Sequence, residues 1–474
     1  METEGKFFGR IGELEVLQDA YDDGSAQMAI VYGRRRVGKT RLLEEFCKDK
    51  RTLFYTARNW PDSIQLSEFS AAMAAFSGQG GAVFSDWVSA IEVFARSEPE
   101  RRKVLVIDEF QYIAQQRPSI LSELQVAWDQ VLSRLNIVLI LCGSAVSFIA
   151  KEVLGQKKPL YGRAKIVMKV RPLSFRTTAE FFPSYCADDK FRAYAALGGI
   201  PYYLGGMQQD LSLAENLAFN VLRDNSFLHS EEQLILMQET RSSVSYNSIL
   251  RAIAYGAAAH GEIAQKSCID ARIISKYLGV LQDMDLVEKE LPVFAGSGDS
   301  GNVQRGIYRI ADNFLKFWFR FVGSSSIALP TRSSALQDYR RRVEPNFASF
   351  ASRAFEDACK EYLIGLGRSG RLPMHLSELG RWWHKDKEID LVGADYEREN
   401  CLVAECKYTS SPVKLEVLDL LEAKISALPL RPRAIVHRWL FSRSGFDPRL
   451  KDLAARDDKL HLVSLEDLLF EPTV

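Results

Sequence analysis

The sequence predicts a multidomain α/β protein with an α/β domain at each end and a largely helical middle. At about 150 residues per domain, the 474 residues suffice for roughly three domains. Short apolar runs alternate with amphipathic stretches in the first part of the chain, as in a parallel sheet covered by helices on both faces. Two further strand-like runs follow a long helical stretch near the carboxyl end and predict a second α/β domain.

Composition excludes several classes of protein. With 47% hydrophobic and 26% charged residues, the chain has the composition of a folded globular protein. Lys plus Arg and Asp plus Glu both number 61, so any nucleic-acid surface has to be a local patch. The seven cysteines are scattered, which argues against a disulfide framework and a zinc site. The amino-terminal residues lack the apolar core of a signal peptide, and the longest apolar stretch is too short to span a membrane. We expect a cytoplasmic protein without membrane contact.

Five apolar runs predict the strands of a three-layer α/β domain, and they cover residues 29–33, 52–56, 104–108, 137–142 and 165–170. A helical region follows from about residue 178 to 243. It is broken at residues 198–201 by the sequence Gly-Gly-Ile-Pro, which a continuous helix cannot accommodate.

Residues 248–293 predict three short helices followed by a β-ribbon, and the run GIYRI predicts a returning strand. Asp270 is the expected N-cap of the third helix. This order of elements is typical of a winged helix-turn-helix. The cations Arg251, Lys266, Arg272 and Lys276 fall around the expected recognition helix. A few cations are also usual on a solvated helix, so this module is predicted to bind either nucleic acid or protein.

A phosphate-binding loop lies between the first predicted strand and the next helix. The residues from Gly33 to Thr40 match G-x-x-x-x-G-K-[ST]. Glycines let backbone N–H groups surround a phosphate, Lys39 neutralises it, and the Thr40 hydroxyl is a ligand for Mg²⁺. A glycine-rich turn with Thr40 as a helix cap is the alternative, which the strand-loop-helix context disfavours. The residues predicted to bind nucleotide here are Gly33, Arg34, Arg35, Arg36, Val37, Gly38, Lys39, Thr40 and Arg41.

Two acids end the third apolar run. Asp108 is placed to hold Mg²⁺, and Glu109 to polarise the attacking water. Acid pairs at strand ends also occur as plain surface residues, but two motifs at this separation favour a nucleotide site. Ser144 ends the next strand, where a hydroxyl can sense the γ-phosphate of ATP.

These motifs, with FGRxxEL from Phe8, PLYGR up to Arg163, and LGGIPYY around Pro201, resemble the archaeal-type ATPase family of the AAA+/STAND group. The resemblance covers roughly the first half of the chain. It implies that Arg163 is an arginine finger or sensor, that Pro201 lies near the adenine, and that Arg10 lies near the nucleotide pocket. From the residues alone, Arg163 would equally be a solvated loop cation.

The carboxyl-terminal part holds a second polar cluster. Asp390 lies in one strand-like run, and Glu405 and Lys407 lie in the next, where alternate residues project to one side. A hairpin through the DYEREN turn would bring Asp390 beside them. Two carboxylates and a lysine suit a Mg²⁺ site for phosphodiester hydrolysis, and Glu356 on the preceding helix is a further carboxylate. An ordinary surface ion pair is the alternative.

This spacing resembles the PD-(D/E)xK nuclease fold, and the segment from about residue 321 resembles the uncharacterised domain commonly fused to archaeal-type ATPases. The proline that usually precedes the Asp is replaced here by Ile389. Trp382 and Trp383 could stack on bases, although such pairs more often pack in a core.

The sequence therefore predicts a P-loop ATPase core (1–176), a helical lid (177–243), a winged helix-turn-helix (244–311) and a PD-(D/E)xK nuclease-like domain (312–474). We expect ATP and Mg²⁺ as cofactors, nucleic acid (DNA rather than RNA) as partner, and a homo-oligomer. The expected function is an ATP-hydrolysing switch that controls the nucleic-acid-directed module. The alternative is a regulatory ATPase whose last domains only bind a partner and whose nuclease site is vestigial, and a structural assembly protein is a third class.

Overall fold

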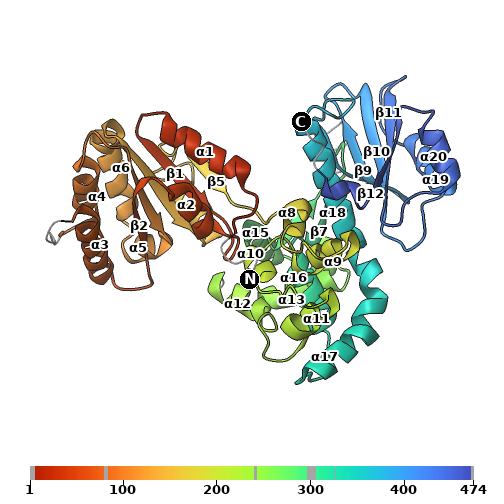
Figure 1. Cartoon of the computed structure of the whole chain (residues 1–474), viewed down its shortest axis with the longest axis horizontal. Helices are drawn as coiled ribbons and strands as arrows, with labels where there is room; N and C mark the ends of the chain where they lie inside the picture. Colours follow the sequence, from red (N-terminus) through yellow and green to blue (C-terminus); the bar gives the residue numbers. More distant parts are fainter. Residues whose placement is uncertain (1–5, 79–83, 240–242, 296–305, 326, 471–474) are drawn as a thin grey trace. The chain divides into compact units, whose positions relative to one another are not determined.

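The computed structural model describes residues 6–78, 84–239, 243–295, 306–325 and 327–470. It divides the chain into two compact units, drawn in Figure 1. The first unit contains residues 1–172 and 200–202, and the second contains residues 173–199 and 203–474. The predicted winged helix and carboxyl-terminal domain fall in the second unit, as does the predicted helical lid apart from residues 200–202. The finer boundaries stay predictions.

A five-stranded parallel sheet forms the centre of the first unit, with strand order β2-β3-β4-β1-β5. All five predicted strands are confirmed. Because the strands are parallel, the residues that follow β1, β3 and β4 lie at one edge of the sheet. The strands are β1 Gln27–Tyr32, β2 Arg51–Thr56, β3 Lys103–Asp108, β4 Ile137–Gly143 and β5 Ile166–Lys169.

Helices cover both faces of this sheet, as the uninterrupted burial of β3 requires. On one face, Leu105 and Leu139 from the strands pack with Phe69, Trp87 and Leu124 from three helices. On the other face, α2 contacts β3 and α1. The helices are α1 Ile11–Asp22, α2 Lys39–Cys47, α3 Asp62–Ser77, α4 Trp87–Arg96, α5 Gln111–Gln116, α6 Ile120–Gln130, η1 Leu132–Arg134, α7 Val146–Phe148 and η2 Ile149–Val153.

The second unit begins with short helices, and the predicted break at residues 198–201 is confirmed. Helix α9 ends at Leu197, and α10 starts at Pro201, where the missing N–H costs nothing. The helices up to the first ribbon are α8 Phe175–Ala179, α9 Ala187–Leu197, α10 Pro201–Gly205, α11 Leu213–Leu217, η3 Ala218–Leu222, α12 Glu231–Glu239, α13 Ser243–Ala254, α14 His260–Ser267 and α15 Ile274–Asp283.

A two-stranded antiparallel ribbon follows α15, formed by β6 (Val287–Glu290) and β7 (Ile307–Ile310). The three helices before it and this ribbon agree with the predicted order of elements. The N-cap prediction was wrong, because Ile273 rather than Asp270 precedes the first residue of α15. The Asp270 carboxylate instead accepts a hydrogen bond from the Arg272 backbone N–H, as in a local turn.

A helical segment leads from the ribbon to the last sheet. The basic stretch YRRRV is helical, and Tyr339 and Val343, which are four residues apart, bury the same face. The helices here are α16 Asn313–Phe317, η5 Trp318–Val322, α17 Arg332–Asp338, η6 Tyr339–Val343, η7 Glu344–Asn346 and α18 Phe347–Arg368.

The carboxyl-terminal sheet has the order β12-β11-β10-β9-β8. Strands β8, β9 and β10 are antiparallel neighbours, whereas β10, β11 and β12 run parallel. Helix α18 packs on β9 and β10. The elements are β8 Glu378–His384, β9 Lys387–Ala394, β10 Asn400–Lys407, α19 Leu415–Ile425, β11 Ile435–Ser442, α20 Pro448–Ala454, β12 Leu460–Ser464 and η8 Asp467–Leu469.

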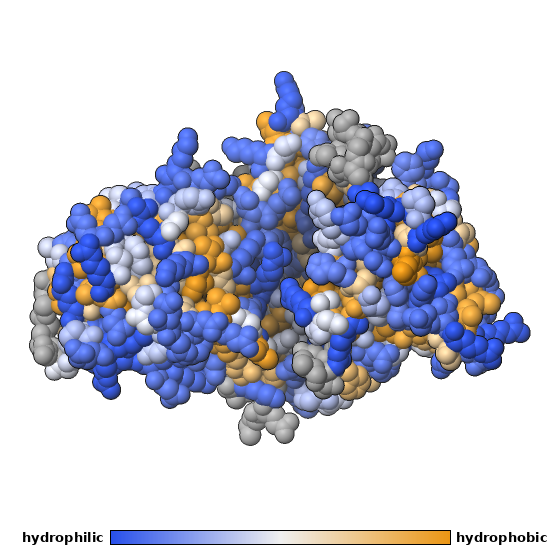
Figure 2. Space-filling model, turned by 90° about the horizontal axis from the view of Figure 1, so that it is seen from above, coloured by the Kyte–Doolittle hydropathy of each residue, from blue (hydrophilic) through white to orange (hydrophobic). Residues whose placement is uncertain are grey.

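Hydrophilic residues cover most of the face drawn in Figure 2, and hydrophobic residues form small patches between them. Within the described part of the chain, none of the helices combines the length and the apolar character needed to cross a membrane.

Candidate nucleotide site and carboxyl-terminal polar cluster

The phosphate-binding loop connects β1 to α2. Gly38 takes the left-handed conformation (φ 94°) just before the helix, which is easy only for glycine. At Gly33, a Cβ atom would lie 2.4 Å from the carbonyl oxygen of Val170, so only glycine lets the chain after β5 pack this closely. The loop therefore ends at a helix N-terminus, where free N–H groups and the helix dipole attract phosphate.

Lys39 points back into the loop that precedes it. Its Nζ donates hydrogen bonds to the carbonyl oxygens of Gly33 (2.8 Å) and Arg34 (3.1 Å), and the side chain is buried. The loop thus holds a cation at the end of the helix. That Lys39 neutralises a bound phosphate stays a prediction.

Thr40 and Asp108 meet at the carboxyl edge of the sheet. The Thr40 Oγ1 donates a hydrogen bond to Oδ2 of Asp108 at 2.7 Å, and Asp108 is 1% exposed. A hydroxyl and a carboxylate side by side beside a phosphate loop fit the oxygen ligands that Mg²⁺ prefers. These two residues would hold the ion, which would neutralise charge on the phosphates of a bound nucleotide.

Glu109 is fixed by a small hydrogen-bond network. Its backbone is left-handed (φ 54°), and its Oε2 accepts from the Ser144 Oγ at 2.6 Å and from the Gln111 Nε2. The Arg35 Nε is 3.4 Å from the Ser144 Oγ, and Gln111 donates to the same Oγ at 3.2 Å. The structure therefore brings together Glu109, Ser144 and Arg35, which sequence motifs had singled out separately. Gln111 was missed, although its position two residues after Glu109 was the available signal.

Three more predicted residues lie against the loop. Arg10 is buried, and its Nη2 donates to the Val37 carbonyl oxygen at 3.0 Å. A Cβ on Gly38 would lie 3.5 Å from the Pro201 ring, which places Pro201 beside the loop. The Arg36 guanidinium lies 4.5 Å from the ring centre of Tyr202.

Arg41 is an exception, because it faces outward and pairs with Glu44 on the helix surface. The structure does not bring Arg163 to the loop either. Arg163 precedes β5, which runs parallel to β1, so it lies toward the sheet edge opposite the phosphate loop. Its guanidinium forms an ion pair with Asp129 (2.7 Å) near the end of α6, and this hydrogen bonding raises the pKa of Arg163.

The predicted hairpin through the DYEREN turn is confirmed, with Leu391 paired to Ala404 and Val392 paired to Val403. Asp390 and Glu405 follow directly at the open end of this ladder. The Asp390 Oδ2 accepts a hydrogen bond from the Cys406 backbone N–H at 2.8 Å. The two acids are thus on neighbouring strands at one end of the hairpin.

Glu405 is paired on both oxygens. Lys407 donates to its Oε1 at 2.6 Å, so these two side chains share a face, as strand alternation predicts. Lys424 on α19 donates to its Oε2 at 3.2 Å, a partner that the sequence did not reveal. Burial, and next the charge of Glu405, raise the pKa of Asp390. Burial alone would lower the pKa of Lys407, because it favours the neutral amine. The charge of Glu405 outweighs burial and raises the pKa of that lysine.

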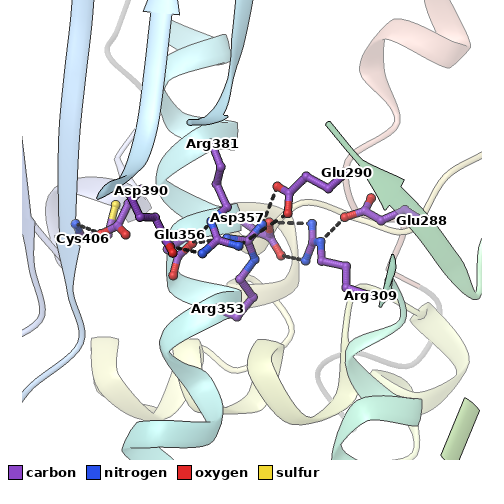
Figure 3. Close-up of polar contacts among 10 residues, drawn as sticks. Glu288, Glu290, Arg309, Arg353, Glu356, Asp357, Arg381, Asp390 and Cys406 are labelled. Atoms are coloured by element: carbon purple, nitrogen blue, oxygen red, sulfur yellow. Dashed lines mark hydrogen bonds and ion pairs between the residues drawn. The ribbon is translucent and has the colours of Figure 1, made fainter. Parts of the chain in front are cut away.

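Glu356 lies on α18 beside Asp390 (Figure 3). Burial raises its pKa to about 7, although Arg353 beside it opposes this shift. Among the residues that the structure describes, no three His, Cys, Asp or Glu side chains gather as a metal-ligand set. Two carboxylates, Asp390 and Glu405, with Lys407 beside them fit a hydrated divalent ion, but they supply fewer protein ligands than a closed site.

The predicted nucleic-acid contacts of the second unit vary in exposure. Trp382 is buried in the core of the last sheet, which favours the packing interpretation over base stacking, while Trp383 is half-buried. Arg272 is exposed but paired with Asp270 at 2.6 Å, and Lys276 is exposed on α15. Arg251 lies over the ring of Tyr255, and Lys266 donates to the Tyr255 carbonyl oxygen.

Two known families match separate parts of the chain. Residues 7–207 match a family described as an ATPase domain predominantly from Archaea. Residues 318–418 match a family of archaeal and bacterial proteins of unknown function. An uncharacterised protein of Methanocaldococcus jannaschii is 29% identical over 402 residues, which is 85% of this chain and 87% of that protein. A shorter uncharacterised ATP-binding protein of the same organism is 44% identical over 45 residues, 10% of this chain and 76% of its own length.

Two solved structures match the chain at low sequence identity. A Walker-type ATPase of Pyrococcus abyssi is 20% identical with a TM-score of 0.49, and the match covers 66% of this chain and 96% of that one. The ORC2 protein of Aeropyrum pernix, solved as ADPNP and ADP complexes, is 14% identical with a TM-score of 0.45, over 73% and 96%.

Proposed function

We propose an ATP-driven switch for this chain, whose residues 7–207 match an ATPase family found predominantly in Archaea. In this proposal the first unit binds and hydrolyses ATP with Mg²⁺. Its nucleotide state controls a nucleic-acid-directed module built from the α13–α15 helices, the β6–β7 ribbon and the carboxyl-terminal sheet.

One observation carries the ATPase part of the proposal. The Thr40 hydroxyl lies 2.7 Å from the Asp108 carboxylate, while Lys39 is buried within the same loop. Two sequence motifs 68 residues apart therefore meet, which supports a single site with an ion-binding and a phosphate-binding half. A glycine-rich turn that matched the motif by chance would not require Thr40 to contact Asp108.

The role of each residue follows from its place. The loop from Gly33 to Thr40 binds the phosphates, and Pro201 and Arg10 support the pocket beside it. Glu109 polarises the attacking water, and Ser144 senses the γ-phosphate through its bond to that carboxylate. Arg163 acts on the nucleotide of a neighbouring copy in a homo-oligomer, since it lies away from its own phosphate loop.

Calorimetric titration with ATP and Mg²⁺ tests nucleotide binding. Lys39→Ala should weaken ATP affinity by at least about tenfold, because it removes the cation that contacts the phosphates. Arg41→Ala is the matched control, since it removes a cation that faces outward two residues along the same helix. Equal affinity of Lys39→Ala and the wild type would contradict the proposal.

For the effector module we propose metal-dependent cleavage of nucleic acid at Asp390, Glu405 and Lys407. The support is the hairpin that sets Asp390 and Glu405 side by side, with Lys407 bonded to Glu405 at 2.6 Å. The carboxylates would hold Mg²⁺, which supplies an activated water, and Lys407 would stabilise negative charge on the phosphate.

A second candidate function is partner binding without cleavage. It is favoured by Glu405, whose two oxygens are already bonded to two lysines. The test is a cleavage assay on DNA and RNA with Mg²⁺ or Mn²⁺, with and without ATP. Cleavage that disappears in Asp390→Ala supports the nuclease, whereas equal inactivity of both proteins supports partner binding.

A further inference from the structure

Two arginines in the second unit converge on a carboxylate from a distant part of the chain. Arg353 lies on α18 and Arg381 on β8, whereas Glu290 is the last residue of β6. The Arg353 Nη2 donates to the Glu290 Oε1 at 2.5 Å, and the Arg381 Nη1 lies 3.6 Å from its Oε2. Figure 3 shows this arginine pair between Glu290 and the side chains of Glu356 and Asp390.

The other carboxylates around the arginine pair are local. Glu356 is three residues from Arg353 on the same helix, and it also lies 3.7 Å from the Arg381 Nε. Glu388 reaches Arg381 from the adjacent strand of the β8–β9 hairpin and is more exposed. Glu290 alone comes from outside the carboxyl-terminal domain, because it belongs to the ribbon 63 residues before Arg353.

The pairing with Glu290 leaves hydrogen-bonding capacity unused. Within the described residues, the Nε atoms of Arg353 and Arg381 and the Oε2 of Glu290 are buried and make no hydrogen bond. Buried polar groups normally find partners. The planar Glu290 carboxylate has only two oxygens to share between two guanidinium groups. A phosphate group presents its oxygens in three dimensions and pairs with arginine bidentately.

We infer that Arg353 and Arg381 form a binding site for a phosphate group of a nucleic-acid backbone, and that Glu290 occupies this site when nucleic acid is absent. The inference rests on the proposed nucleic-acid-directed function and names a binding site for it. A phosphate bound at this site would lie next to Asp390, where the scissile strand would have to pass.

The ribbon need not leave for the site to open. Val293 donates its backbone N–H to the Arg381 carbonyl oxygen at 2.8 Å, and Val293 and Phe294 are buried in the core of the last sheet. The backbone after Glu290 is therefore anchored beside the arginine pair. In this proposal the Glu290 side chain rotates away and a phosphate takes the place of its carboxylate, so the residue acts as a built-in competitor.

Binding of labelled DNA oligonucleotides, single- and double-stranded, measured by fluorescence anisotropy with EDTA present, tests the inference without any cleavage. Glu290→Gln should bind DNA on the order of tenfold more tightly than the wild type, because a neutral amide competes poorly for two arginines. Adding Arg353→Gln to Glu290→Gln should remove the gain.

Glu288→Gln is the matched control. It removes one negative charge from the same strand, but Glu288 pairs with Arg309 rather than with the arginine pair. Its DNA affinity should stay within about twofold of the wild type, since a charge away from the site changes only the general field. Circular dichroism melts of all variants identify any that do not fold, and Arg381→Gln replaces Arg353→Gln if the latter unfolds.

Each other outcome overturns a defined part of the inference. An equal gain from Glu288→Gln and Glu290→Gln would mean a general charge effect and no site. Tight binding of inorganic phosphate to Glu290→Gln without a gain for DNA would assign the site to a free phosphate group. DNA binding that is unaffected by Glu290→Gln and Arg353→Gln would overturn the site but leave the proposed function intact. No DNA binding by any protein would overturn both the site and the nucleic-acid-directed part of the proposed function.

Discussion

Ser144 donates a 2.6 Å hydrogen bond from its Oγ to the Oε2 of Glu109. The residue that follows β4 therefore fixes the carboxylate that follows β3. Gln111 donates to both of them and completes a closed triangle. A change in the position of Ser144, such as contact with a γ-phosphate would cause, is transmitted directly to the proposed water-activating group.

This relationship predicts the effect of Ser144→Ala. ATP turnover should fall by about tenfold to a hundredfold, because Glu109 loses its positioning partner, while ATP affinity changes by less than about threefold. Ser147→Ala is a suitable control, since the buried Ser147 Oγ makes no hydrogen bond with the described residues. Turnover measured at saturating ATP checks the prediction, and equal rates for the two variants would refute the triangle's role.

Arg163 should matter for hydrolysis and little for ATP binding. If it stabilises charge on the nucleotide of a neighbouring copy, ATP turnover per wild-type molecule rises with protein concentration. Arg163→Ala should lower turnover at every concentration in that range. Asp129→Asn breaks the ion pair seen here but keeps the arginine, so it should retain turnover. If Arg163→Ala and Asp129→Asn lose ATP turnover equally, the ion pair between Arg163 and Asp129 has a structural role instead.

Gly33→Ala should destabilise the first unit, by about 2 kcal/mol or more, because the new Cβ would lie 2.4 Å from the Val170 carbonyl oxygen. Gly12→Ala is the contrast, since a Cβ there meets no atom within 4 Å and alanine favours the α1 helix. Chemical denaturation of both variants is the measurement. Equal free energies of unfolding would show that the close approach to Val170 is unimportant.

Glu361 gives the second unit a pH-dependent stability. Burial raises its pKa to about 7, although the Phe175 N–H and the Tyr194 hydroxyl donate to its carboxylate. The folded protein thus keeps a proton that the unfolded chain releases near pH 4.5, so stability falls as pH rises from about 4.5 to 7. A difference of one in pKa between the folded and the unfolded chain corresponds to about 1.4 kcal/mol of unfolding free energy.

Glu361→Gln should remove this dependence. Relative to the wild type, the melting temperature of the variant should be higher at pH 8 than at pH 5, because the wild type alone bears the cost of a buried charge at pH 8. Thermal melts at the two pH values measure this difference. An equal difference in melting temperature between variant and wild type at pH 5 and pH 8 would mean that Glu361 does not titrate in this range.

Local patterns made most of the first unit predictable. Its strands are continuous apolar runs, and the residues at their carboxyl ends share one edge because the sheet is parallel, so Thr40 and Asp108 could be expected to meet. In the last domain, strand alternation placed Glu405 and Lys407 on one face, and the turn after β9 brought Asp390 beside them.

Long-range pairing was not predictable in this way. Lys424 reaches Glu405 from a later helix, and Asp129 pairs with Arg163 from an earlier one. Nothing in the local sequence of β6 indicates that Glu290 will contact Arg353, 63 residues further on. Such partners depend on how helices and strands pack, which a periodic pattern does not specify.

The turnover and ATP affinity of Glu109→Gln test the central claim most directly, because this residue separates hydrolysis from nucleotide binding. The account predicts that the variant binds ATP with Mg²⁺ as tightly as the wild type, within about threefold, while its turnover falls by at least about a hundredfold. Wild-type turnover in Glu109→Gln, or the absence of ATP hydrolysis by the wild-type protein, would contradict it.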